Sequence, residues 1–91
     1  MTNQELQAYI AGKIHRSDLA AELPGFIEAA RVNINRRFGL SLVAFVNPAD
    51  TNAVLSDWPD LYQFDALRAA YEWLNDGPNA QYYGQRWNQV C

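Results

Sequence analysis

The sequence predicts an all-α fold, a small bundle of four main helices with short extra turns and one apolar extended loop. Apolar residues recur at the spacing of three and four residues that is typical of amphipathic helices. Capping residues, prolines and glycines stand where such segments begin and end. One segment, residues 40–50, lacks the helical period. With 91 residues, 49% of them hydrophobic and 19% charged, the chain is expected to form a single globular domain over residues 1–91.

Composition and charge argue against several classes of protein. The formal net charge of −3 speaks against general nucleic-acid binding, which depends on Lys and Arg neutralising phosphates. The single cysteine, Cys91, cannot form an intramolecular disulfide, and no apolar run is long enough to span a membrane. The N-terminus lacks the charged and apolar blocks of a signal peptide. We therefore expect a soluble, unexported, intracellular protein that does not bind membranes.

Charge is unevenly distributed along the chain. Residues 1–39 contain five basic and four acidic residues, whereas residues 40–91 contain two basic and six acidic ones. This asymmetry suits copies packed front to back, where a basic patch meets a neighbour's acidic patch. Chance scatter over a solvated surface explains the same numbers equally well.

The N-terminal segment predicts an amphipathic helix over residues 3–15. Thr2 and Glu5 have the spacing of a capping box, in which both side chains satisfy free amides at a helix start. The helical spacing of one face is followed by Leu6, Tyr9, Ile10, Lys13 and Ile14, and the residues expected to be solvated are Gln4, Glu5, Gln7 and Lys13.

A second helix is predicted from Pro24 to Phe38. Ser17 is a suitable cap for a short turn through Ala21, and Pro24 fits the first position of a helix because its missing N–H costs nothing there. Gly39 is placed to end the helix in the left-handed conformation. The expected core stripe is Ile27, Ala30, Ile34 and Phe38, and the opposite side carries Glu28, Arg31, Asn35 and Arg36.

Residues 40–50 are predicted to form an apolar extended loop. Apolar side chains alternate here until Asn47 and Pro48 mark a turn, but a strand would have no ladder partner in the chain. We interpret the segment as a loop that packs on the bundle, or as one that pairs with or inserts into another molecule.

The C-terminal half predicts one short and two long helices. Thr51 is expected to cap a short helix that ends near Asp57, and a strongly apolar helix is expected over residues 59–75. Its polar side chains at positions 65, 68 and 72 are expected to form a narrow solvated stripe with two favourable charge pairs. A stop at residues 76–78 precedes a final helix from Pro78, with a stripe of Ala80, Tyr83, Trp87 and Val90.

The sequence offers little for catalysis, and we expect no enzyme activity, no cofactor and no metal. The chain has one His and one Cys, at opposite ends, and lacks a nucleophile elbow or a phosphate-binding Gly-rich loop. Asp57 and Asp60 flank Trp58 and Pro59, and are expected to cap a helix and favour its N-terminal dipole rather than to bind a metal ion.

Three groups of residues are candidates for a protein interface. They are a basic group on the second helix, apolar side chains of the extended loop, and aromatic side chains of the last helix, the latter because aromatic residues are enriched at interfaces. The candidates are Arg31, Arg36 and Arg37; Leu42, Val43, Phe45 and Val46; and Tyr82, Tyr83 and Trp87.

Two stretches of the sequence form recognisable motifs, the first at residues 14–19, 23–27 and 34–37, and the second at residues 51–55 and 58–62. Together they resemble the adaptor, or head-to-tail connector, proteins of tailed bacteriophages. The resemblance covers about two-thirds of the chain, and both motifs occur in the family's order. Many family members carry a long β-rich insertion between the motifs, whereas only about thirteen residues, 38–50, separate them here. This places the chain closer to the shorter, purely helical connectors.

The resemblance implies a structural virion protein of the phage neck. Such a protein forms a ring beneath the portal, extends the DNA channel and docks a downstream neck or tail protein. The implied partners are the portal protein and neighbouring copies, dodecameric in the virion and monomeric when isolated, with packaged DNA passing through without sequence-specific binding. The host cytoplasm would be the site of assembly. The matching residues, Leu19, Pro24, Phe26, Ile27, Ile34, Pro59, Leu61, Tyr62 and Leu67, would be architectural.

The main alternative is a small helical DNA-binding or regulatory protein. Arg31, Arg36 and Arg37 could contact nucleic acid, and the first two helices could be mistaken for a helix-turn-helix. The connector between them is not the short Gly-containing turn of that motif, and the domain is acidic overall.

Overall fold

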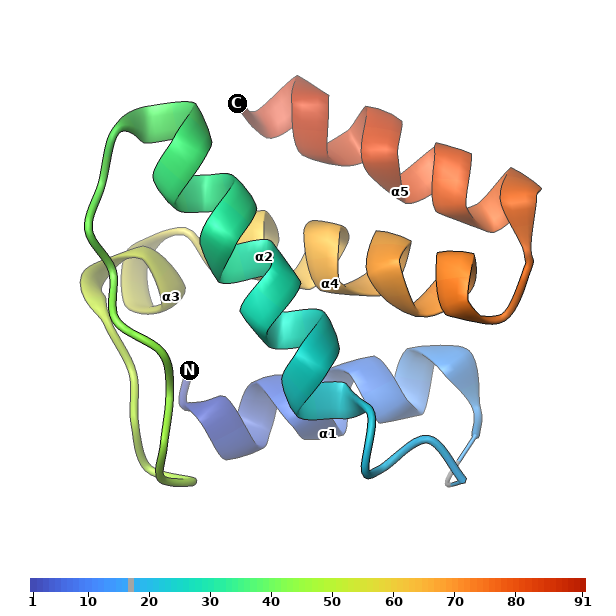
Figure 1. Cartoon of the computed structure of the whole chain (residues 1–91), viewed down its shortest axis with the longest axis horizontal. Helices are drawn as coiled ribbons and strands as arrows, with labels where there is room; N and C mark the ends of the chain where they lie inside the picture. The colour runs from blue at the N-terminus through green and yellow to red at the C-terminus, as the bar shows by residue number, and fades with distance from the viewer. Residues whose placement is uncertain (17) are drawn as a thin grey trace.

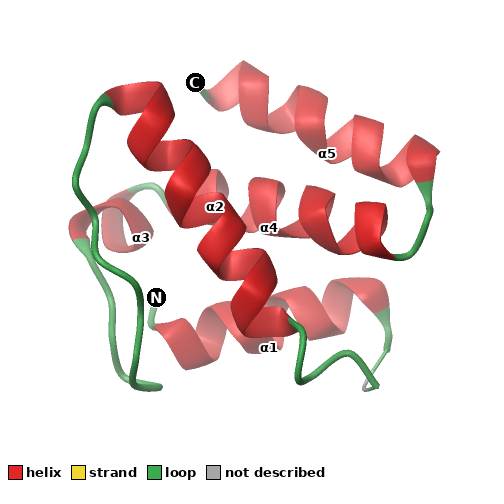
Figure 2. Cartoon of the chain, viewed as in Figure 1, coloured by secondary structure: helices red, strands yellow, loops and turns green. Residues whose placement is uncertain are grey.

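A computed structural model describes residues 1–16 and 18–91, so the expected cap at Ser17 lies outside the described residues. In this part of the chain five helices and their connecting loops form the fold (Figures 1 and 2). The predicted all-α bundle is confirmed. In chain order the helices are α1 (Asn3–Ile14), α2 (Leu23–Phe38), α3 (Ala53–Asp57), α4 (Pro59–Trp73) and α5 (Gly77–Val90).

Helix α4 is the centre of the bundle and contacts each of the other four helices. In Figure 1, α4 lies between α1 and α5, while α2 crosses in front of these helices. A helix in this position is covered on most sides, which explains its strongly apolar sequence. Ala66 and Ala70 are completely buried, and their small side chains allow neighbouring helices to approach α4 closely.

Local signals define most of the helix ends. The Thr2 hydroxyl accepts a hydrogen bond from the Glu5 backbone at 3.3 Å, and the Glu5 carboxylate accepts one from the Thr2 backbone at 2.9 Å, which confirms the capping box. Helix α2 ends at Gly39 with φ at +65°, the left-handed conformation that glycine adopts without a Cβ penalty. At the end of α1, His15 adopts the same conformation with φ at +54°.

The cap of α3 differs from the prediction. Asn52, not Thr51, is the N-cap, and its side-chain oxygen accepts a hydrogen bond from the Leu55 backbone at 2.8 Å. The Thr51 hydroxyl donates instead to the Met1 carbonyl, 2.6 Å away. Both residue types are good caps, and the Asn52 amide also donates a hydrogen bond to the Tyr62 hydroxyl at 2.9 Å.

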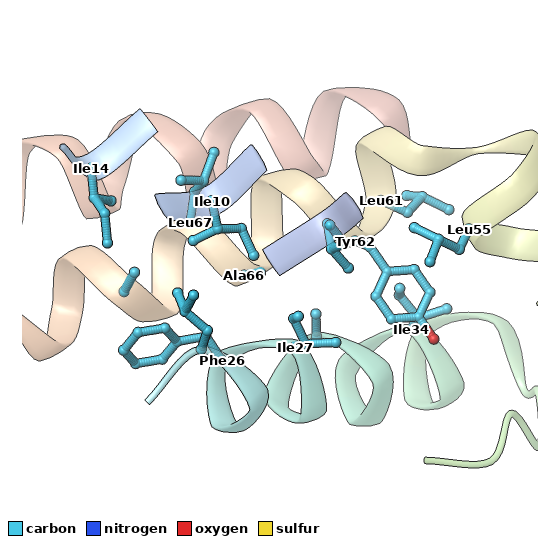
Figure 3. Packing of buried hydrophobic residues seen from close by; sticks show 14 of the residues in the cluster. Ile10, Ile14, Phe26, Ile27, Ile34, Leu55, Leu61, Tyr62, Ala66 and Leu67 are labelled. Carbon is cyan, nitrogen blue, oxygen red and sulfur yellow. The ribbon is translucent and has the colours of Figure 1, made fainter. Parts of the chain in front are cut away.

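The predicted core stripes are largely confirmed. Side chains from α1, α2 and α4 fill the space between these helices, and Leu55 of α3 joins them (Figure 3). Phe38 and Val90 are exceptions, because they are 43% and 44% exposed at the last turns of α2 and α5. The core members from the first two helices are Leu6, Ile10, Ile14, Leu23, Phe26, Ile27, Ala30 and Ile34.

The expected solvated stripe on α4 is wrong for Asp65, which is only 2% exposed. Its carboxylate accepts hydrogen bonds from Arg68 Nε at 2.7 Å and from the Asn33 amide of α2 at 2.8 Å. Gly84 of α5 lies over the Arg68 stem, since a Cβ at Gly84 would be 3.6 Å from Arg68 Cδ. Both predicted charge pairs are present, because Arg68 also contacts Glu72 at 2.8 Å. Packing of α2 and α5 against α4 therefore turns a solvated pair into a buried one.

Candidate protein-binding surface

The extended loop is tied to α2 at its start. The Leu42 N–H donates to the Asn35 side-chain oxygen at 2.9 Å, and the Leu42 carbonyl accepts from Arg31 Nη1 at 2.7 Å. Arg31 also forms an ion pair with Glu28, and its side chain is 19% exposed. This pairing raises the pKa of Arg31, chiefly through the hydrogen bond to the Glu28 carboxylate. The Arg31 guanidinium is thus engaged within the subunit, where it orders the loop.

Asp50 ties the other end of the loop. Its carboxylate accepts hydrogen bonds from the backbone N–H groups of Val46 at 2.7 Å and Asn47 at 2.8 Å. The Asp50 carbonyl accepts from the Asn3 N–H of α1, also at 2.7 Å. The loop is held to α2 at one end and to α1 at the other, so its side chains have defined directions.

The Asp50 contacts predict an acid-sensitive loop. Hydrogen bonds from the Asn47 and Val46 backbones lower the pKa of Asp50 from its ordinary value of 3.8. A lowered folded-state pKa means that the stabilising effect is present above about pH 4 and is lost as the pH falls through the folded-state value. We expect Asp50→Asn to reduce the dependence of the free energy of unfolding on pH below 4, measured by urea denaturation. An unchanged pH profile would contradict this role of the carboxylate.

The loop side chains divide into two sets. Leu42 and Phe45 pack against the core, and the Phe45 ring lies 5.5 Å from the Tyr62 ring, centroid to centroid. Val43 and Val46 point away from the core, with 79% and 81% of their side chains exposed. The prediction that the loop packs on the bundle is confirmed for the first pair. The second pair remains available to another molecule.

The C-terminal aromatic candidates also divide. Tyr83 is stacked on Tyr71 at 5.7 Å between ring centroids, and Trp87 packs against the core. The Trp87 indole N–H is buried without a hydrogen-bond partner among residues 1–16 and 18–91. Tyr82 is 53% exposed and contacts Tyr83 edge-on. Of the three, Tyr82 presents most of its ring to the surface.

Arg36 and Arg37 lie exposed on the last turn of α2, beside an open cleft of about 430 Å³. Asp65 also lines this cleft, but it is already bound to Arg68 and Asn33. The free charge of the cleft is therefore positive. We call it the basic cleft, and it is lined by Asn33, Arg36, Arg37, Arg68, Trp87 and Asn88 together with Asp65 and Gly84.

A second, strongly apolar depression involves residues that were not among the sequence candidates. It has a volume of about 350 Å³ and is lined only by apolar side chains. Four of these are exposed large hydrophobic residues: Phe38 at 43%, Leu40 at 42%, Trp58 at 66% and Val90 at 44%. We call it the apolar groove, and its lining residues are Phe38, Leu40, Val54, Trp58, Leu61 and Val90.

The apolar groove forms where three helix ends meet. Phe38 ends α2, Trp58 immediately precedes α4, and Val90 ends α5. Because these positions lie at element boundaries, helical periodicity does not group them. The sequence contained one signal that Trp58 is exposed. Asp57 precedes this tryptophan and Asp60 follows it after the helix-starting Pro59, and such a charged setting is unusual for a core tryptophan. Trp58 itself is the N-cap of α4, without a side-chain cap bond, so neither aspartate caps this helix. Asp60 does stand in the first turn, where a carboxylate favours the helix dipole as expected.

Two further searches of the described residues complete the inventory. Residues 1–16 and 18–91 include no cluster of three or more His, Cys, Asp or Glu side chains arranged to hold a metal ion. In the same residues no helix combines the length and apolarity needed to cross a membrane. The fold and surface define a small all-helical protein whose most distinctive feature is an exposed apolar groove. Comparison with models of known protein families, with curated proteins and with solved structures gave no match.

Proposed function

We propose that this protein is a structural adaptor that acts through protein–protein contacts and has no catalytic role. The observation that carries this proposal is the apolar groove. Four large hydrophobic side chains, 42% to 66% exposed, gather in one concavity at the ends of three helices. Contiguous exposed apolar surface of this kind marks interaction sites in folded proteins. Trp58 at the rim has the chemistry of a binding hot spot.

The more specific proposal is an adaptor ring of the phage neck, bound beneath the portal, which extends the DNA channel and docks tail or neck components. Its support is the resemblance of residues 14–19, 23–27, 34–37, 51–55 and 58–62 to tailed-phage connectors. The matched positions have architectural places in this fold: Phe26, Ile27 and Tyr62 are buried where α2 meets α4. In this proposal the helical bundle presents Val43, Val46 and the apolar groove as contact surfaces for the portal and for neighbouring copies.

The test is the mass, by light scattering, of the protein mixed with a tailed-phage portal ring, compared with each component alone. We expect a stable complex that contains a ring's worth of copies. Trp58→Ala should weaken this complex at least about tenfold, because an exposed tryptophan in an interface is a common hot spot. Trp73→Ala is the matched control, since Trp73 is 58% exposed at the opposite end of α4. A folded protein that fails to bind the portal at high micromolar concentration would exclude the neck adaptor.

A small helical DNA-binding or regulatory protein is the second candidate function. The observation that favours it is the basic cleft, where Arg36 and Arg37 are exposed. Arg31 is bound to Glu28 and Leu42, which leaves two arginines for phosphates. Affinity for duplex DNA that falls steeply with salt and is lost in Arg36→Glu/Arg37→Glu would support this candidate over the adaptor.

A further inference from the structure

We propose that the apolar groove is the centre of a two-fold interface with a second copy of this chain. The proposal concerns the free protein and stands independently of the phage assignment. It replaces the expectation of a monomer in isolation with a dimer whose two grooves face each other.

Acidic, apolar and basic residues follow one another in order along the surface that includes the groove. Three residues of the groove, Trp58, Leu61 and Val90, also line a second depression of about 320 Å³. The lining of this second depression includes Asp57 and Asp60. We call this the acidic notch. It adjoins the groove through the shared residues, so apolar and acidic surfaces are continuous at the start of α4.

The basic cleft follows the groove along α4, because this helix contributes Asp60 to the notch, Leu61 to the groove, and Asp65 and Arg68 to the cleft. Arg37 directly precedes Phe38 on α2, and Asn88 lies two residues before Val90 on α5, so each helix passes from the cleft into the groove. The C-terminal ends of α2 and α5 lie on the same side of the molecule in Figure 1. The resulting strip follows α4 and runs from basic through apolar to acidic.

The charged ends of the strip are unpaired within the subunit. Among residues 1–16 and 18–91, the ion pairs are Arg16 with Asp18, Arg31 with Glu28, and Arg68 with both Asp65 and Glu72. None of these uses the two arginines or the two aspartates of the strip. The side chains of Arg36, Arg37, Asp57 and Asp60 are all exposed.

A strip with this order is complementary to itself after a rotation of 180°. The rotation places the basic end of one copy against the acidic end of the other and brings the two apolar centres together. The contact between a basic and an acidic end forms twice, and the two Trp58 rings, exposed at the groove rim, are buried in the centre. In a parallel arrangement of the same strips, like charges would face each other. In a head-to-tail arrangement of two copies, one charged end of each copy would have no partner.

The first measurement is the mass of the free protein by sedimentation equilibrium over a range of concentrations. The chain mass is 10.3 kDa, and we expect a reversible transition to twice this value. Trp58→Ala should raise the dimer dissociation constant at least about tenfold. Trp73→Ala should leave it unchanged. A monomer at all concentrations up to about 1 mM, or growth to larger open assemblies, would overturn the two-fold interface.

A charge exchange tests the order of the strip directly. Arg36→Glu/Arg37→Glu makes both ends acidic, and Asp57→Lys/Asp60→Lys makes both ends basic, so each variant alone should remain monomeric. An equimolar mixture of the two should form a heterodimer, because opposite charges then meet at both ends. Circular dichroism establishes that each variant is folded. Homodimers of either folded variant, or no heterodimer in the mixture, would refute the proposed arrangement.

Trp58→Ala is expected to weaken both the portal complex and the dimer, so the two proposals are separated by the other measurements. The dimer is measured without any portal present, and the charge-exchange mixture has no counterpart in the portal assay. A dimer that forms without portal binding would retain this inference and remove the neck assignment. Portal binding by a strictly monomeric protein would support the neck assignment and overturn the two-fold interface.

Discussion

Asp65→Ala is expected to lower the free energy of unfolding by about 3 kcal/mol, because it leaves a largely covered guanidinium without its main partner. The Asp65 carboxylate is 3% exposed and binds both Arg68 Nε and the Asn33 amide. Arg68 is 22% exposed, and its pKa is raised first of all by the hydrogen bond from its guanidinium to Asp65. Loss of the carboxylate therefore removes the hydrogen bonds of Arg68 Nε and of the Asn33 amide, and leaves the exposed Glu72 as the only ion-pair partner of Arg68 among the described residues. The measurement is urea denaturation followed by circular dichroism.

Glu72→Ala is the matched control for Asp65→Ala. Glu72 binds the same guanidinium at 2.8 Å, but its side chain is 59% exposed. Water screens this pair, so its removal should cost less than about 1 kcal/mol. Equal effects of the two substitutions would show that burial of Asp65 does not govern the strength of its contacts.

Tyr62→Ala is expected to destabilise the protein by about 4 kcal/mol, the range for removing a large aromatic side chain from a core. Tyr62 is completely buried in α4 and contacts the Phe45 ring of the extended loop. Its hydroxyl accepts a hydrogen bond from the amide of Asn52, which caps α3. The substitution should therefore loosen the loop and α3 in addition to leaving a cavity. Thermal unfolding and hydrogen exchange at residues 42–55 measure both effects.

Tyr62→Phe separates the two contributions of this side chain. It preserves the packing of the ring and removes only the hydroxyl that holds Asn52, for an expected cost of about 1 kcal/mol. Faster hydrogen exchange should then be confined to α3 and its cap. A loss as large as that of Tyr62→Ala would contradict the division between packing and capping.

Local chemistry made much of the fold predictable. The capping box of Thr2 and Glu5, the left-handed Gly39 and the helix-starting Pro59 act within one turn of their own positions. Their effect does not depend on the rest of the molecule, so the helix bounds followed closely from the sequence. Periodicity likewise placed Leu6, Ile10 and Ile34 in the core.

The candidate binding surface was predictable only in part. Val43, Val46 and Tyr82 are exposed as an interface requires, whereas Tyr83 and Trp87 are partly committed to internal packing. Arg31 is engaged by Glu28 and the Leu42 carbonyl. A sequence pattern identifies which side of a helix a residue occupies, but not whether a loop from elsewhere in the chain returns to that side.

The sequence by itself determined the all-α class, the helix boundaries and most of the core, because these depend on interactions between residues one to four positions apart. Only the tertiary structure decided that Asp65 is buried, that Phe38 is exposed and that three helix ends form one apolar groove. These properties depend on how α2 and α5 pack against α4. Such contacts join residues far apart in the chain, and no local pattern specifies them.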